Sequence, residues 1–209
     1  MKLRFFWTFA AIIFAVSSAN ASCTETNSDI ALGWAESPHV SAWANVDSDC
    51  KAWTFISIDG PLERSTFRAI NAAMLESMSA GVFTDRMVFI LNSPGGDLDG
   101  AYLSALGMHG ATTVILEDGQ CASACTILFA AGENRVIAKG GLLGIHSAYY
   151  SGSGEQALLG NIKVVNFLES QGVKHKRVME LMNTTPGTDM VWLNAQNTKA
   201  LGFATRIAN

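Results

Sequence analysis

Residues 121 to 125 read Cys121-Ala122-Ser123-Ala124-Cys125, and this stretch carries most of the information in the chain. It places one serine among very small residues, just ahead of an apolar run that ends at Gly132. This pattern predicts a helix over 122–131 with the serine in its first turn, beside unpaired N–H groups that stabilise a negative oxygen. Taken alone, an Ala-Ser-Ala segment is more typical of close helix packing than of catalysis.

Two further motifs give the serine a chemical context. Gly95-Gly96 lies upstream between a predicted strand and a predicted helix, where glycine lets the backbone approach a ligand and point an N–H at it. His146 lies downstream, where it could take a proton from Ser123. The N–H of Ala124 would be a donor to a negative oxygen at the serine. Nucleophile, oxyanion hole and general base are therefore all available in this sequence.

Strand-like and helix-like segments alternate through the chain after residue 50. The apolar patterns predict strands over 53–58, 87–91, 112–116 and 135–138, and helices over 63–79, 97–109, 122–131, 155–171, 174–182 and 193–201. Such alternation is typical of an α/β fold with a largely parallel sheet flanked by helices. Residues 22–50 are polar and irregular, and we interpret them as an N-terminal extension packed on this domain.

The first 21 residues have the pattern of a secretory signal peptide. Lys2 and Arg4 precede an apolar run over 5–16, and Ala19-Asn20-Ala21 forms a small-x-small cleavage site. The run is shorter than the roughly 20 residues that span a bilayer as a helix. We therefore expect export, to the periplasm or the medium. With a net charge of −4 and no basic stripe, the chain does not favour nucleic acid as a partner.

Four cysteines lie in the chain expected after cleavage, and all four are disulfide candidates in an exported protein: Cys23, Cys50, Cys121 and Cys125. Pairing Cys121 with Cys125 would bracket Ser123, and pairing Cys23 with Cys50 would tie down the extension. The sequence does not choose among the three pairings. A zinc site would need more ligands than His146 alone, so we expect no metal and no cofactor.

The three motifs in this order resemble the proteolytic subunit of the Clp protease and, more broadly, the ClpP/crotonase superfamily. Gly96 precedes Ser123 by 27 positions and His146 follows it by 23. The resemblance covers about residues 53–204, and it is greatest to exported, periplasmic-type ClpP-like serine proteases with cysteines flanking the serine. It implies a ClpP/crotonase-like ββα superhelix over 51–209. It also implies that Ser123 is the nucleophile, His146 the base, and the N–H groups of Gly96 and Ala124 the oxyanion hole.

The third member of a catalytic triad has no evident counterpart. The family places an acidic residue about seven positions before Leu193, where this chain has Pro186. Asp189 is the only carboxylate nearby and is our candidate, with Asn183 as the alternative orienting group. A Ser-His dyad without a third residue remains open, as does a Ser-Lys pair using Lys139.

The resemblance implies a serine endopeptidase that cuts peptide or unfolded protein substrates, without an ATP-driven unfoldase and as a possible homo-oligomer. Two other functions stay open. A catalytically inactive scaffold or binding protein would account for the missing acidic residue, and a crotonase-type acyl-CoA enzyme would share the fold and the oxyanion hole. Export argues against the acyl-CoA enzyme, because CoA substrates are cytoplasmic.

Overall fold

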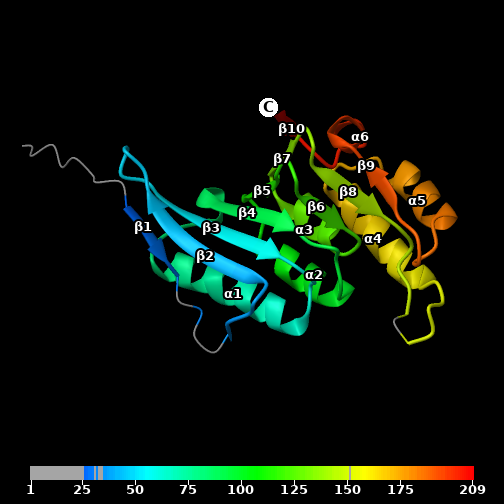
Figure 1. The fold of residues 1–209 in the computed structure, drawn as a ribbon, viewed down its shortest axis with the longest axis horizontal. Coiled ribbons are helices and arrows are strands. Elements are labelled where there is room, and N and C mark those ends of the chain that lie inside the picture. The colour runs from blue at the N-terminus through cyan, green and yellow to red at the C-terminus, as the bar shows by residue number, and fades with distance from the viewer. Residues whose placement is uncertain (1–25, 31, 33–34, 151) are drawn as a thin grey trace, which may run out of the picture.

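This computed structural model describes residues 26–30, 32, 35–150 and 152–209. Its main feature is a mostly parallel β-sheet. Its strand order is β1 (Thr26–Asp29), β2 (Val40–Val46), β3 (Ala52–Asp59), β4 (Met87–Asn92), β5 (Thr112–Ile115), β7 (Asn134–Ala138) and β10 (Arg206–Ala208). Neighbours from β3 to β10 are parallel, whereas β1, β2 and β3 are antiparallel (Figure 1). The predicted α/β class is confirmed.

A second, smaller sheet carries the residues of chemical interest. It has the order β6 (Gln120–Ala122), β8 (Leu142–Ile145) and β9 (Val191–Leu193), with β6 parallel to β8 and β9 antiparallel to β8. Ala122 pairs with Gly144. Because parallel strands end at the same edge of a sheet, the residues that follow β6 and β8 emerge together. This pairing brings Ser123 and His146 to one place.

The helices cover the large sheet and surround the small one. They are α1 (Arg64–Ser79), α2 (Leu98–Ala105), α3 (Cys125–Ala131), α4 (Leu158–Ser170), α5 (His175–Thr184) and α6 (Ala195–Ala200), with a short 3₁₀ turn η2 (Thr84–Arg86). Figure 1 shows α1 and α2 beneath the large sheet, and α4, α5 and α6 gathered around β8 and β9. Helix α3 lies between these groups and contacts both α2 and α4. All seven of its residues are buried.

Helix α1 shows how the apolar spacing produces the core. Phe67, Ile70 and Met74 recur at helical spacing and are buried against the sheet, as predicted. Met78, predicted for the same face, is 46% exposed because the helix ends one residue later. The first turn is fixed by a capping box between Glu63 and Thr66. Helix and sheet thus hold each other through one continuous apolar layer.

The N-terminal extension differs from the irregular segment that we expected. Within it, β2 pairs along its whole length with β3, and β1 pairs with β2. Val40 and Ala42 are buried at alternate positions, and Trp43 stacks on Phe55 with ring centroids 5.5 Å apart. The polar residues between them hid this alternation in the sequence. Strands β1 and β2 of the extension therefore enlarge the sheet.

The expected signal peptide over 1–21 and the candidate Cys23 lie outside the described residues. Among the residues that are described, no helix combines the length and the apolar character that crossing a bilayer requires.

Arg135 ties the end of the chain to the large sheet. This half-buried side chain on β7 donates from Nε to the carbonyl oxygen of Phe203 at 2.6 Å, and from its two terminal nitrogens to Gly132 at 3.1 Å and Gly202 at 3.2 Å. Burial lowers the pKa of its guanidinium. One planar group thus provides donors for carbonyl oxygens at the ends of α3 and of the segment after α6.

Arg135→Met should lower the free energy of unfolding by about 2–3 kcal/mol, because the half-buried carbonyl oxygens lose a charged donor. Urea unfolding measures the effect. Arg206→Met makes the same change at an exposed position on the neighbouring strand and should cost less than about 0.5 kcal/mol. Equal losses in the two variants would contradict the anchoring role.

Candidate active site

Ser123 lies in a sharp turn between strand β6 and helix α3. Its backbone has φ +55°, in the left-handed region that residues with a Cβ rarely adopt. Among the described residues, Cys50 is the only other non-glycine residue with a positive φ. The helix begins at Cys125, so the expected start at residue 122 is corrected: β6 continues through Ala122. The turn lifts Ser123 out of both elements instead of placing it inside the helix.

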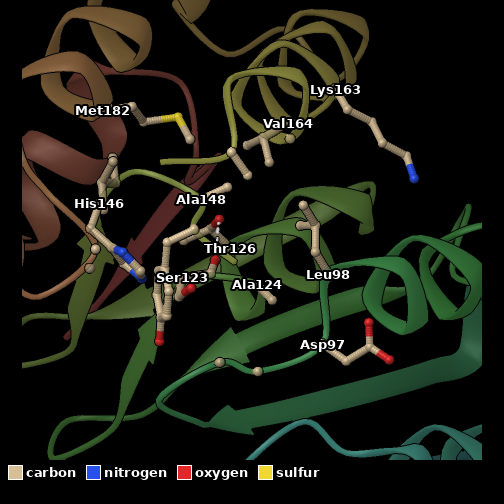
Figure 2. Close-up of a pocket in the computed structure, with 18 of the residues that line it drawn as sticks. Asp97, Leu98, Ser123, Ala124, Thr126, His146, Ala148, Lys163, Val164 and Met182 are labelled. Carbon is tan, nitrogen blue, oxygen red and sulfur yellow. Dashed lines mark hydrogen bonds between the residues drawn. The ribbon is translucent and has the colours of Figure 1, made fainter. Parts of the chain in front are cut away.

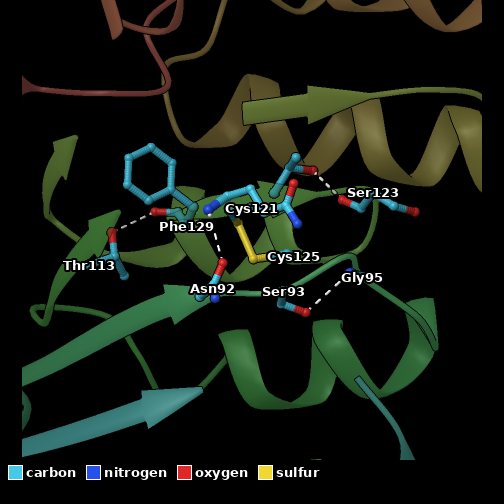
Figure 3. Close-up of a disulfide and its surroundings, with 10 residues drawn as sticks. Asn92, Ser93, Gly95, Thr113, Cys121, Ser123, Cys125 and Phe129 are labelled. Carbon is cyan, nitrogen blue, oxygen red and sulfur yellow. Dashed lines mark hydrogen bonds between the residues drawn. A yellow bond between two sulfur atoms is a disulfide. The ribbon is translucent and has the colours of Figure 1, made fainter. Parts of the chain in front are cut away.

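Hydrogen bonds hold this turn on both sides. The Ser123 N–H donates to the carbonyl oxygen of Gly144 on β8 at 3.0 Å. The Ser123 carbonyl oxygen accepts from the N–H of Thr126 at 3.0 Å and from its hydroxyl at 2.7 Å (Figures 2 and 3). The backbone of Ser123 is therefore paired, and its hydroxyl has no hydrogen bond within the described residues.

A disulfide closes the same turn. Cys121 and Cys125 are joined, with Cα atoms 5.2 Å apart, and both residues are fully buried. Figure 3 shows the bond together with Ser123, which lies between the two cysteines in the sequence. This disulfide is one of the two that we named as candidates. The other, Cys23–Cys50, involves a residue outside the described range.

The two glycines of the upstream motif lie in close contact with other segments, Gly95 with the serine turn and Gly96 with Leu62. Gly95 has φ +93°, and a Cβ at this position would lie 2.5 Å from the Ala122 carbonyl oxygen and 2.7 Å from Ser123 Cβ. A Cβ on Gly96 would lie 2.2 Å from the carbonyl oxygen of Leu62. Because glycine has no Cβ, it allows the backbone at both positions to approach these neighbours so closely.

The backbone N–H groups of Gly96 and Ala124 remain without acceptors. The neighbouring amides are paired: Gly95 N–H donates to Ser93 Oγ at 3.1 Å, and Asp97 N–H donates to the Leu62 carbonyl oxygen at 2.9 Å. Within the described residues no hydrogen bond is made by the N–H of Gly96 or of Ala124, and both residues line the pocket that contains Ser123. Two free donors beside a serine are what an oxyanion hole requires.

His146 follows β8 and faces the same pocket. Figure 2 shows its imidazole ring directed toward Ser123, although no hydrogen bond joins the two side chains. The residue is 8% exposed, and burial is the main cause that lowers its pKa below the ordinary value of 6.5. Apo active sites often have long contacts between nucleophile and base, which tighten when substrate binds.

The far nitrogen of His146 has no partner. Nδ1 is buried and makes no hydrogen bond within the described residues. Asp189 is exposed, and its carboxylate accepts a hydrogen bond from the N–H of Met190 at 2.8 Å. Asn183 and Lys139 are also exposed. The structure therefore does not bring Asp189 or Asn183 into a hydrogen bond with His146, and Lys139 is not among the residues that line the pocket.

The segment after His146 is fixed from helix α5 instead. The Ser147 hydroxyl donates to the Met182 carbonyl oxygen, and the Ser147 N–H donates to the Thr185 carbonyl oxygen at 2.9 Å. Gln156 in turn donates to the Ser147 hydroxyl at 2.7 Å. The ring of Tyr149 lies 5.7 Å from the His146 ring, centroid to centroid. These hydrogen bonds to the neighbouring residue position the histidine. In a catalytic triad a carboxylate would do this. The sequence contained no periodic pattern that marks these contacts.

A pocket of about 890 Å³ connects these groups. Its inner wall is apolar and comes mainly from α4, α5 and the segment after α6: Val164, Leu168, Val178, Met182 and Phe203. Three charged residues also line it, and two of them form an ion pair from Lys163 Nζ to Asp99 Oδ1 at 2.6 Å. Figure 2 shows Lys163 and Asp97 on the side of the pocket away from His146. The pocket can receive an apolar group beside Ser123. No cluster of three or more metal-ligating side chains occurs in the described part of the chain.

Comparison with known proteins identifies the fold. No model of a known protein family matches the sequence, and no curated protein is similar to it in sequence. ClpP1 from Listeria monocytogenes has a similar structure, with a TM-score of 0.59 and 18% identity over 74% of this chain and 91% of that one. A mutant of the 1510-N membrane-bound stomatin-specific protease has a TM-score of 0.55 and 15% identity over 73% of this chain and 77% of that one. The predicted ClpP/crotonase-type fold is confirmed.

Gly95→Ala should be more damaging than the same substitution at Gly81. Gly81 has φ +82° and no atom within 4 Å of an added Cβ, so Gly81→Ala should cost only the left-handed backbone strain of about 1–2 kcal/mol. Gly95→Ala adds overpacking against Ala122 and Ser123, which costs about 1–3 kcal/mol more. Urea unfolding of both variants measures the difference, and equal losses would contradict close packing at the serine turn.

His146 should titrate with a midpoint below pH 6.5. The measurement is an NMR titration of the imidazole signals, and the His146→Ala variant assigns the signal of this residue. Since the unfolded chain has the ordinary pKa near 6.5, it binds more protons than the folded chain as the pH falls through this range. His146 therefore lowers the stability of the fold in acid and contributes no such penalty above this range. A midpoint at or above 6.5 would show that the ring is not desolvated.

Proposed function

We propose, from the ClpP-type fold and from the geometry around Ser123, that this protein is a serine peptidase that hydrolyses peptide bonds. Ser123 is the nucleophile and His146 the general base. The N–H groups of Gly96 and Ala124 form the oxyanion hole. The observation that carries the proposal is the left-handed turn at Ser123, which presents a free hydroxyl beside two free amides and a buried histidine in one pocket.

The reaction follows from these positions. The Ser123 hydroxyl attacks the carbonyl carbon of the scissile bond while His146 takes its proton. The carbonyl oxygen becomes an oxyanion that accepts hydrogen bonds from the two free amides, which need no rearrangement to meet it. The protonated histidine then gives its proton to the leaving amine. Water, deprotonated by the same histidine, releases the acyl group from Ser123.

The site acts as a dyad in this proposal. The lowered pKa keeps His146 neutral, and so able to accept a proton, in mildly acidic solution. The imidazolium that forms during attack has no anionic partner at Nδ1 within the described residues. Its formation is therefore less favourable than in a triad, and slow turnover is expected.

The substrates and the setting are part of the same proposal. The pocket beside Ser123 suits short peptides or unfolded segments, which the protein would cut without an ATP-driven unfoldase. The pattern over residues 1–21 supports export to the periplasm or the medium, where disulfides such as Cys121–Cys125 persist. The protein needs no cofactor for this chemistry, and a homo-oligomer is compatible with it.

A catalytically inactive binding protein of the same fold is the second candidate. The unpartnered Nδ1 of His146 favours it, because a histidine without an orienting group is a weak base for a serine hydroxyl. Such a protein would bind peptides in the same pocket without cleaving them.

Ser123→Ala should abolish covalent labelling by a fluorophosphonate and the cleavage of unfolded casein in the absence of nucleotide. His146→Ala should slow both by about 10²- to 10⁴-fold, the usual contribution of a general base. His109→Ala alters an exposed histidine outside the pocket and should leave both unchanged.

The wild-type protein separates the two candidate functions. Peptide binding without labelling or cleavage, in a sample shown to be folded by circular dichroism, would favour the binding protein. Labelling that persists in Ser123→Ala would assign the nucleophile to another residue.

A further inference from the structure

The turn that carries Ser123 combines an unfavourable backbone conformation with a weak helix start. Ser123 has φ +55°, and Ala124, the N-cap residue of helix α3, provides no side-chain cap. Helix α3 is seven residues long. A left-handed serine beside an uncapped short helix persists only if its surroundings hold it there.

The non-covalent contacts restrain this turn incompletely. The hydrogen bonds from Ser123 to Gly144 and from Thr126 to Ser123 hold the N–H and the carbonyl group. Gly95 blocks one side of the turn. All of these bonds can lengthen together if the start of α3 moves away from the end of β6.

The disulfide prevents that movement. Cys121 is paired with Leu143 on β8 and bridged to Ser93, so its backbone belongs to the small sheet. Cys125 is the first residue of α3. Their bond connects the sheet to the helix across the three residues Ala122, Ser123 and Ala124, and both cysteines are 0% exposed. The residues enclosed are the nucleophile and one donor of the oxyanion hole.

We propose that the Cys121–Cys125 disulfide is a positioning element for the nucleophile, so that the site reaches its full rate only when this bond is oxidised. The inference rests on the proposed function. Without the bond, the turn relaxes toward a negative φ at Ser123, and the serine hydroxyl and the Ala124 N–H leave their shared geometry. Misplacing reacting groups by about 1 Å can cost about 10²-fold in rate.

The switch requires a dithiol reductant. The sulfur–sulfur bond breaks, each of the two sulfurs gains one electron and one proton, and the reductant is oxidised to its own disulfide. Because both sulfurs are buried, the reductant reaches them only when the turn opens locally, and reduction of the native protein is slow.

The test compares wild type with the double variant Cys121→Ala/Cys125→Ala. Labelling by a fluorophosphonate is measured over a range of reagent concentrations, which separates the maximal rate from the half-saturating concentration. The maximal rate should fall about 10- to 100-fold with little change in the half-saturating concentration. Dithiothreitol should slow labelling of wild type, reoxidation should restore it, and the double variant should not respond.

A matched control excludes a general loss of stability. Ile56→Val removes one methyl group from a fully buried position on β3, a strand of the large sheet, and should lower Tm without lowering the maximal labelling rate. If the double variant does not fold, wild type is compared before and after reduction, with thiol alkylation and peptide mass to confirm which cysteines have reacted.

Hydrogen exchange tests the conformational claim independently of activity. Loss of the disulfide should accelerate exchange of the amides of Ser123 and Thr126 while those of β3 and β4 keep their protection. Equal labelling rates with unchanged local exchange would overturn the inference. If oxidised wild type is not labelled at all, the proposed function fails. Faster exchange at Ser123 and Thr126 alone would then show that the disulfide restrains the turn but has no catalytic role.

Discussion

The left-handed turn at Ser123 is the constraint on which the rest of the site depends. The turn connects β6 of the small sheet to α3. Gly95 packs against it, and the Cys121–Cys125 disulfide joins its two ends. With this turn, Ser123, Ala124 and Gly96 line one pocket, and within the described residues the N–H groups of Ala124 and Gly96 make no hydrogen bond.

The electrostatic character of the site follows from burial more than from charge. His146 lies at the end of a buried strand, its Nδ1 makes no hydrogen bond within the described residues, and burial is the main cause that lowers its pKa. The charged residues of the pocket, Asp97, Asp99 and Lys163, include an ion pair, and Figure 2 shows Asp97 and Lys163 on the side away from His146. Burial thus favours the neutral imidazole, and the segment that carries it is held in place through Ser147 and the backbone of α5.

Much of the fold could be predicted from apolar spacing, and the exceptions have physical causes. The pattern at Phe67, Ile70 and Met74 marked α1 because a helix that packs on a sheet buries one face. Strand β2 was missed because only Val40 and Ala42 of its residues are buried, and its partner β3 supplies the rest of the signal. The start of α3 was placed three residues early, because small residues fit a helix and a turn equally well.

The sequence by itself determined which groups are available: a serine among small residues, two cysteines around it, a glycine pair and a histidine at fixed spacings. These are properties of local residue types and their order. Only the tertiary structure decided how they meet. The parallel pairing of β6 with β8 brings Ser123 and His146 together, and the left-handed φ orients the hydroxyl. Asp189, between α5 and β9, is exposed and makes no hydrogen bond to Nδ1 of His146. Strand register and the placement of a loop against a distant histidine arise from long-range packing, which spacing along the chain does not encode.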